Sequence, residues 1–434
     1  MADNESYCIM ITEFVMNRYF PLCLLLLALL TLGCSKKKST EPSDQEILQE
    51  SVQALIDSMW QDYQDQNGIE TGGILFHAQK GEDRFFCKSH MPSDASKYSL
   101  FRAASVTKTF TASAIMLMQE RNQLDIDDLI TANIPGSKQT YLPATDDFDI
   151  PFKDQITIRS LLEHRAGVFD PTNFDIPDSV DAIYAGMNWL GWMLEQDEAH
   201  NFSIDEVISV IAEHQLYHHE PGAEYNYSNT GYMLLGAIVQ RVSGMALEDY
   251  FVTQFCEPNS LSGISFPLDS MHLLPQPRIP CWVLMDATAY EADIYNMSYE
   301  VAQGNLVTNT NDLLSWLMKW QKGQAGLSLD TVYDMRESSY PDQNYGLGTS
   351  YMEGFGYGHT GALAGFLTLM FYDPATDYGF VLLCNMWDFN SDTSFDEQVF
   401  TLFDIAAKAK LMITGEEDRF FQTKDQISVS LRLR

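Results

Sequence analysis

Ser105 and Lys108 form the first of three short motifs whose side chains could cleave an amide or an ester. At positions i and i+3 they share one face of a helix, so the amine can reach the hydroxyl. A serine becomes a nucleophile when a base takes its proton, and a lysine serves as that base when burial lowers its pKa. A second Ser-x-x-Lys, Ser35 to Lys38, lies in a polar segment, so this spacing alone does not identify a catalytic pair.

Tyr227 and Asn229 form the second motif, on a loop that leads into an apolar helical run. The phenol could transfer a proton, and the amide two residues later could orient a substrate amide. Alternatively, Tyr227 fills the entry to the helix and Asn229 is the N-cap of that helix. Taken alone, the motif favours this second interpretation.

His359, Thr360 and Gly361 form the third motif, at the end of a predicted strand. A glycine lets a substrate approach the strand backbone closely. The next backbone N–H could complete an oxyanion hole with the N–H of Ser105. The alternative is a histidine at the edge of a strand followed by a turn glycine.

The order of the motifs is more specific than any one of them. Ser-x-x-Lys, then Tyr-x-Asn, then a basic residue followed by Thr-Gly is the signature of the penicillin-recognising serine hydrolases. The chain therefore resembles class C β-lactamases, D-alanyl-D-alanine carboxypeptidases and related esterases. Four further segments carry the likeness, at residues 101–104, 156–167, 221–229 and 304–308.

The resemblance implies a role for each motif residue. Ser105 would be the acylated nucleophile, Lys108 its base, and Tyr227 the proton relay to the leaving group. The N–H groups of Ser105 and Ala362 would form the oxyanion hole. The predicted substrate-binding residues are Asn229, His359, Thr360, Gly361 and Ala362. The substrate would be a β-lactam, a D-Ala-D-Ala peptide or an ester, and no metal or other cofactor is expected.

His359 stands where β-lactamases carry a lysine that meets the substrate carboxylate. Histidine is a weaker and pH-dependent substitute, and within the resembling family it is familiar from D-Ala-D-Ala carboxypeptidases and esterase-like relatives, which disfavours a dedicated β-lactamase. The resemblance thus implies an exported hydrolase that is D-Ala-D-Ala carboxypeptidase-like or β-lactamase-related, with a short-chain esterase of the same family as an alternative. An alternative of another class is a non-catalytic lipoprotein that binds penicillin or peptidoglycan. The intact set of Ser105, Lys108 and Tyr227 favours an enzyme.

The elements that must position these residues follow from hydrophobic periodicity. Helices are predicted at 47–63, 105–119, 156–164, 180–195, 204–214, 230–243 and 395–411, with a short helix at 125–129. Strands are predicted at 72–79, 84–88, 345–351, 355–360, 365–372 and 379–385. Strands at both ends with helices between them predict one sheet domain interrupted by a helical lobe.

The expected fold is α+β, with an antiparallel sheet flanked by helices and an inserted all-helical lobe, as in β-lactamases and transpeptidases. The catalytic domain spans 49–412. Its sheet lobe comprises 49–125 and 300–412, and its helical lobe comprises 126–299. The tail at 413–434 has no assignment.

Residues 1–33 are predicted to be a signal peptide. Leu22–Leu32 is an apolar run too short to span a bilayer and right for the core of such a signal. Gly33-Cys34 followed by a polar tether at 34–48 resembles a bacterial lipoprotein signal, which predicts lipidation at Cys34, with Met1 or Met16 as the start. The expected location is the bacterial cell envelope, with the periplasm or outer surface left open. The alternative is an ordinary signal peptide with a chance cysteine.

The net charge of −34 disfavours nucleic-acid binding, because that field repels phosphates. Four scattered cysteines, Cys87, Cys256, Cys281 and Cys384, do not make a disulfide scaffold or a zinc site. His214 and His218 have the i, i+4 spacing of a metal-ligand pair, but the sequence offers no third ligand. The oligomeric state is left open.

Overall fold

The computed structural model describes residues 42–341 and 343–416, and its centre is a six-stranded antiparallel sheet in the order β2-β1-β12-β11-β10-β9. The strands are β1 (Ile74–Lys80), β2 (Asp83–Ser89), β9 (Ser350–Met352), β10 (Gly356–Leu363), β11 (Phe366–Asp373) and β12 (Tyr378–Cys384). β1 pairs with β12 from Ile74↔Cys384 to Lys80↔Tyr378. The sheet thus joins the two ends of the domain, and the predicted α+β fold with an antiparallel sheet is confirmed.

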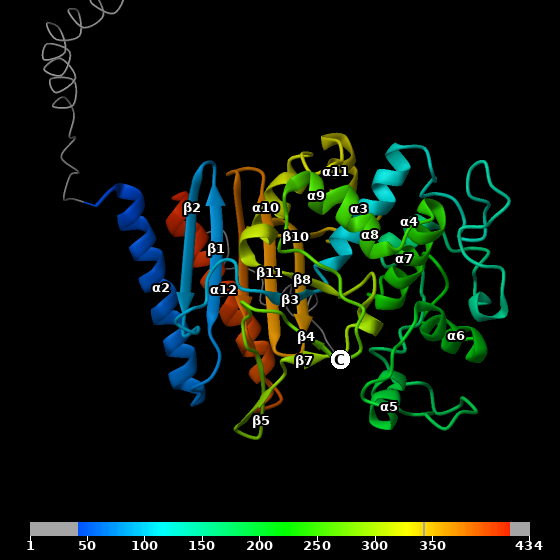
Figure 1. Cartoon of the computed structure of the whole chain (residues 1–434), viewed down its shortest axis with the longest axis horizontal. Helices are drawn as coiled ribbons and strands as arrows, with labels where there is room; N and C mark the ends of the chain where they lie inside the picture. Colours follow the sequence, from blue (N-terminus) through cyan, green and yellow to red (C-terminus); the bar gives the residue numbers. More distant parts are fainter. Residues whose placement is uncertain (1–41, 342, 417–434) are drawn as a thin grey trace, which may run out of the picture. The chain divides into compact units, whose positions relative to one another are not determined.

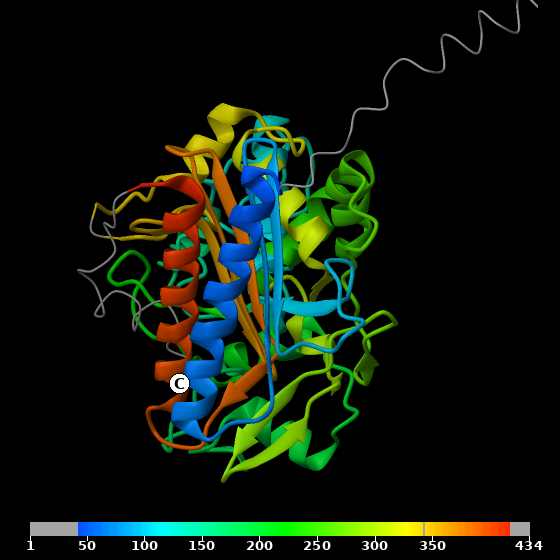
Figure 2. The ribbon, with the colours of Figure 1, turned by 90° about the vertical axis from the view of Figure 1, so that its left-hand side faces the viewer.

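Helices cover both faces of this sheet. α2 (Asp44–Asn67) and α12 (Ser394–Thr414) lie side by side on one face, where Figure 2 shows them in blue and red. Their apolar side chains and those of the strands form one hydrophobic cluster. On the other face, α10 (Thr310–Gln321) packs on β1, β11 and β12. β12 is buried along its whole length, which explains its continuous apolar sequence.

The helical insertion lies beyond α3 (Thr107–Glu120), on the side of the sheet away from α2 (Figure 1). Its elements are α4 (Ile158–Leu162), α5 (Trp189–Gln196), α6 (Ile204–His214), α7 (Asn229–Ser243), α8 (Leu247–Phe251) and α9 (Glu257–Asn259). β3 (Phe101–Ala104) pairs with β8 (Leu306–Thr308) and connects the insertion to the sheet. α11 (Leu329–Arg336) follows α10.

The stretch 126–299 is not helical throughout. Near its end it forms β4 (His272–Leu273), β5 (Trp282–Met285), β6 (Thr288–Glu291) and β7 (Ile294–Tyr295), and β5 also pairs with β13 (Met386–Asp388). The sequence predicts no strand here, because the individual pairings are only two to four residues long, below the length at which alternation becomes visible.

Three other predicted elements differ from the structure. Residues 125–129 form a turn, because Asp125 Oδ1 accepts the N–H of Asp127 at 3.0 Å and competes with a helix. The predicted helix 180–195 begins only at Trp189, after Gly186 at φ +74°. The strand predicted at 345–351 is reduced to β9, because Gly348 at φ +74° interrupts it.

Several features predicted for the termini lie outside the described residues. These are the signal peptide at 1–33, the lipidation site Cys34, most of the tether, and residues 417–434 of the tail. Within the described ranges, no helix has both the length and the apolar character needed to cross a bilayer. Cys87, Cys256, Cys281 and Cys384 are buried free thiols.

Candidate active site

Ser105 lies in the turn between β3 and α3, one residue before the helix N-cap. Ala104, just before it, has φ +51°, the left-handed region that a residue with a Cβ rarely occupies. The turn is held because Thr107 Oγ1 donates to Ala104 O at 2.7 Å and Lys108 N donates to Ser105 O at 3.0 Å. Backbone strain of this kind gathers at functional sites, and here it directly precedes the predicted nucleophile.

Lys108 is completely buried and its Nζ lies 3.2 Å from Ser105 Oγ. The same Nζ donates to Asn229 Oδ1 at 2.7 Å and to Gln303 O at 2.9 Å. All three partners are uncharged. Burial lowers the pKa of Lys108 to about 7, although the carboxyls of Glu300 and Asp170 act in the opposite direction. The amine is therefore able to exist without its proton near neutral pH.

Tyr227 and Asn229 stand where the loop enters α7, and both reach Lys108. The Lys108 ammonium lies 4.8 Å from the centre of the Tyr227 ring. Burial raises the pKa of Tyr227 well above its ordinary value, while its hydrogen bond with Ser105 acts to lower it. The N-cap of α7 is Ser228, whose side chain accepts the N–H of Gly231 at 3.2 Å. The interpretation of Asn229 as the N-cap is therefore wrong, and its side chain is left to face the lysine.

Asp170 is a buried residue of this site that the sequence analysis missed. Its Oδ2 accepts the backbone N–H of Asn229 at 2.8 Å, and its Oδ1 accepts the hydroxyl of Thr172 at 2.6 Å. The carboxylate thus fixes the backbone that carries Asn229. Its position in the chain, before Pro171, reads only as a turn signal, and nothing local indicates a partner 59 residues later.

Gly361 brings β10 against the strand that precedes Ser105. A Cβ at this position would lie 2.1 Å from Ala103 O, so only a glycine permits the approach. Leu363, two residues later in β10, clusters with Ala104, the residue before Ser105. The strand of the third motif thus lies against the strand that leads into the first motif.

His359 is buried within β10 and both its ring nitrogens have partners. Nδ1 lies 2.6 Å from the carbonyl oxygen of Thr360, so it carries the proton and donates it. Nε2 then accepts the hydroxyl of Tyr345 at 3.0 Å. Burial, and secondarily the charge of Lys108, lowers the pKa of His359 to about 3. The imidazole is neutral at physiological pH, unlike the lysine that β-lactamases carry here.

His164 packs on Tyr227 and steadies it. The two rings lie 4.2 Å apart, and His164 Nδ1 accepts the N–H of Ser228 at 3.1 Å. Tyr225, Tyr232 and Tyr345 complete the aromatic surroundings of the imidazole. Burial holds the pKa of His164 well below its ordinary value, so it contributes a neutral surface. His164 lies in the segment 156–167, which the resemblance covers but to which it assigns no role.

The two histidines with metal-ligand spacing lie elsewhere and point to different partners. His214 Nε2 lies 2.7 Å from the hydroxyl of Tyr184, and the ring of His218 packs between Phe169 and Phe174. Within residues 42–341 and 343–416, no group of three or more potential ligands could hold a metal ion.

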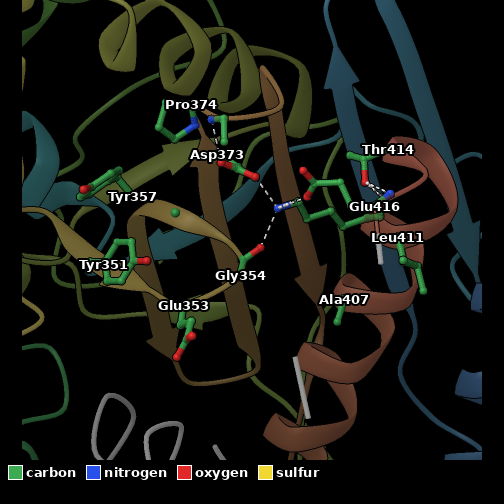
Figure 3. A pocket seen from close by; sticks show the side chains of 13 residues that line it. Tyr351, Glu353, Gly354, Tyr357, Asp373, Pro374, Ala407, Leu411, Thr414 and Glu416 are labelled. Atoms are coloured by element: carbon green, nitrogen blue, oxygen red, sulfur yellow. Dashed lines mark hydrogen bonds and ion pairs between the residues drawn. The ribbon is translucent and has the colours of Figure 1, made fainter. Parts of the chain in front are cut away.

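A cavity of about 360 Å³ lies away from the motif residues, between the ends of β9–β11 and the last turns of α12 (Figure 3). Its polar centre is the buried Lys410, whose Nζ lies 2.5 Å from Asp373 Oδ2 and 2.7 Å from Gly354 O. None of the predicted site residues lines it. The predicted site residues therefore lie outside this cavity.

One family model matches most of the chain. The family model described as Beta-lactamase matches residues 70–399. The chain belongs to the Beta-lactamase family. This is a family of serine hydrolases and acyl-transferases, which agrees with the serine, lysine and tyrosine that the structure brings together.

Two curated proteins are similar to this chain at low sequence identity. Protein flp of Staphylococcus aureus (strain NCTC 8325 / PS 47) is 24% identical over 303 residues, which cover 67% of this chain and 54% of that protein. Penicillin-binding protein 4* of Bacillus subtilis (strain 168) is 26% identical over 216 residues, covering 49% and 40%. The chain thus spans about half the length of the curated relatives it matches, or less.

Solved structures share the fold over nearly their whole length. A D-stereospecific amidohydrolase from Streptomyces sp. has a TM-score of 0.63 at 20% identity and covers 85% of this chain and 99% of its own. The D-amino acid amidase from Ochrobactrum anthropi SV3, in complex with L-phenylalanine amide, has a TM-score of 0.63 at 20% identity. The match covers 84% of this chain and 99% of the amidase. A penicillin-binding protein from Bacillus halodurans has a TM-score of 0.60 at 17% identity, and the match covers 82% of this chain and 98% of that protein.

Proposed function

We propose that this member of the Beta-lactamase family hydrolyses an amide or ester through an acyl-enzyme on Ser105. The observation that carries the proposal is the buried Lys108 amine 3.2 Å from Ser105 Oγ, with its pKa lowered to about 7. A lysine in this state accepts a proton at neutral pH, which is what a general base requires.

The reaction follows from the contacts of each residue. Lys108 takes the hydroxyl proton while Ser105 Oγ attacks the substrate carbonyl. The N–H groups of Ser105 and Ala362 stabilise the oxyanion. Tyr227 passes the proton to the leaving nitrogen or oxygen, and its raised pKa keeps the phenol protonated and able to donate. Water, activated by the same groups, then releases the acid and restores the serine.

The substrate side of the site favours a neutral leaving group. His359 carries no charge near neutral pH, and its two nitrogens are engaged by Thr360 and Tyr345. A free carboxylate next to the scissile bond, as in penicillins and D-Ala-D-Ala peptides, would therefore meet no charge on His359. We therefore place small amides and esters of D-amino acids first. Two of the solved structures of this fold are enzymes for D-configured amides.

A D-alanyl-D-alanine carboxypeptidase is the second candidate. Relatives named penicillin-binding proteins favour it, and Asn229 is placed to hold the acyl-amide side chain of such a peptide. The non-catalytic binder has weaker support, because a binder has no need of a lysine with a lowered pKa beside the serine.

Export and lipid anchoring at Cys34 remain part of the proposal. They rest on the apolar run Leu22–Leu32 and on the cysteine that follows it. The expected result of Cys34→Ser is loss of palmitate incorporation and release of the protein into the soluble fraction. Unchanged labelling would contradict the anchor without affecting the proposed chemistry.

Intact-mass analysis tests the enzymatic proposal. The protein is exposed to an activated ester, a D-phenylalanine amide, a D-Ala-D-Ala peptide and a labelled penicillin. We expect a covalent adduct from the ester in the wild type and none in Ser105→Ala, and faster turnover of the D-amide than of the peptide. An adduct that persists in Ser105→Ala, or none in the wild type, contradicts the proposal. Faster turnover of the peptide would favour the carboxypeptidase.

A further inference from the structure

Lys108 is connected to a second buried acid that the reaction above does not use. Gln303 lies between them: its Oε1 accepts a hydrogen bond from Lys108 Nζ at 3.3 Å, and its Nε2 donates to Glu300 Oε2. Glu300 is only 6% exposed. A single side-chain amide thus joins the base to a carboxyl, with its acceptor end toward the amine and its donor end toward the acid.

The Glu300 carboxyl occupies a space that the local sequence leaves open for it. A Cβ at Gly304 would lie 1.9 Å from Glu300 Oε2, so a side chain at that position would displace the acid. The other oxygen, Oε1, accepts the Tyr295 hydroxyl at 3.5 Å, and Tyr299 donates to Tyr295 in turn. Both carboxyl oxygens therefore accept hydrogen bonds, which suits the ionised form.

Most of the other titratable groups near this pair are uncharged histidine and tyrosine side chains. The groups facing Lys108 are Asp170, His164, His359, Tyr227 and Tyr232, and those beside Glu300 are Tyr295 and Tyr299, with Arg102 next to both tyrosines. Burial keeps both histidines and all four tyrosines neutral. Arg102 donates to the backbone oxygens of His272 and Asp293.

Asp170 and Glu300 are then the two carboxyls that act on Lys108, and they differ in their attachments. Asp170 is tied to the Asn229 backbone and to Thr172. Glu300 has its connection through Gln303. Burial raises the pKa of Glu300 to about 7, although the charge of Lys108 acts in the opposite direction, so each group of this pair favours the charged form of the other.

We propose that Glu300, acting through Gln303, is a positioning residue that controls how readily Lys108 takes the Ser105 proton. The inference rests on the proposed function. As the Ser105 O–H bond breaks and an N–H bond forms on Lys108, the new ammonium is stabilised by the Glu300 carboxylate through the oriented amide. When Lys108 passes the proton on by way of Tyr227, the amine is neutral again and Glu300 is unchanged.

The test is the pH profile of Ser105 acylation in the full-length protein. The second-order rate with an activated ester is measured from pH 5 to 9 for wild type, Glu300→Gln, Glu300→Asp and a control, Asp388→Asn. The control removes a completely buried carboxyl that accepts the Tyr63 hydroxyl at 2.7 Å and does not contact the site. Glu300→Gln removes a negative charge that favours the ammonium, so the midpoint of the acid limb should fall by about one pH unit. The plateau rate should also decrease.

Glu300→Asp should return the midpoint most of the way to the wild-type value, and Asp388→Asn should leave it unmoved. A midpoint that Glu300→Gln does not shift, or that Asp388→Asn shifts equally, overturns the inference alone. The absence of any adduct on the wild type overturns the proposed function as well. Should Glu300→Gln not fold, Gln303→Leu replaces it. This variant keeps the backbone carbonyl but removes the connecting amide, so acylation should slow by about tenfold, and an unchanged rate overturns the inference.

Discussion

Two buried lysines in this molecule differ in the partners that surround the ammonium group. Lys108 is completely buried and donates to the serine hydroxyl, the Asn229 amide oxygen and the Gln303 carbonyl, all of which are neutral. Lys410, only 6% exposed, contacts the Asp373 carboxylate directly, and Gly354 O is its second acceptor (Figure 3).

The difference shows that the position of the acid decides what a buried lysine can do. At Lys410 the acid is in contact. Burial raises the pKa of Asp373, but hydrogen bonds from Lys410 and the Ala375 N–H outweigh it and leave that pKa lowered. The pair is therefore a fixed structural ion pair. At Lys108 the acid is one amide away, so the amine is held in place while its proton remains transferable.

Replacing Lys108 should affect the acylation rate, whereas replacing Lys410 should affect the stability of the fold. Lys108→Met should lower the rate of Ser105 acylation by about 1,000-fold, because the general base is lost. Lys410→Met should leave that rate unchanged and lower the free energy of unfolding by about 3 kcal/mol, because the mostly buried Asp373 carboxylate loses its ion-pair partner. Ester labelling and urea denaturation measure the two effects. If Ser105 is not acylated in the Lys410 variant, the assignment of a purely structural role to Lys410 is wrong.

Placing an acid in contact with Lys108 should make it resemble Lys410. Asn229→Asp puts a carboxylate where the amide oxygen now lies 2.7 Å from Nζ. The pKa of Lys108 should rise by about two pH units, so acylation at pH 7 should drop by about 50-fold and recover as the pH increases. Rates at pH 7 and pH 9 test this directly. Asn229→Ala is the control, because it removes the same contact without adding a charge and should show no recovery at high pH.

Neutralising the acid beside Lys410 should affect stability and not chemistry. Asp373→Asn should cost about 1 to 3 kcal/mol of unfolding free energy at pH 7, since Lys410 would keep only Gly354 O and the more distant Glu416. The pKa of Asp373 is lowered in the folded state. Its stabilisation is therefore present above the ordinary aspartate pKa and is lost as the pH falls through the lowered value. Urea titrations at pH 7 and pH 3 should show the difference between wild type and variant shrinking.

The smallest expected effect is the change in the acylation rate of the wild-type protein with pH. Lys108 must be unprotonated to accept the serine proton, and its pKa is lowered to about 7. Acylation at pH 6 should thus be about tenfold slower than on the plateau above pH 8. A rate that stays constant from pH 8 to pH 5 would show that the base is not a titrating lysine.

The sequence predicted which candidate residues lie together, because the order of the motifs in the chain is a long-range signal. Ser105, Lys108, Tyr227 and Asn229 meet in the structure, and Gly361 is in backbone contact with the strand before them. Strands and helices with clear periodicity, such as α6 and β12, were also found within a residue or so. The hydrophobic periodicity that predicts such elements depends only on residues close together in the sequence.

Residues whose role depends on a distant contact could not be found in this way. Asp170, Glu300 and Tyr345 have no unusual neighbours in the sequence, and each acts through a partner that only the fold supplies. His359 was identified, but its hydrogen bond with the hydroxyl of Tyr345 was not. The short strands at 272–295 were missed for a related reason, since their pairing depends on tertiary contacts more than on alternation.

The contact between Gly361 and Ala103 has a consequence for the order in which the enzyme matures. The environment that activates Ser105 is completed by a strand from the last third of the chain, and that strand can dock only where no side chain intervenes. A nascent or partly folded chain therefore carries the serine without the strand that we propose binds the oxyanion. The protein should remain inert toward its substrate until the sheet is complete, and reactivity of Ser105 should report on finished folding.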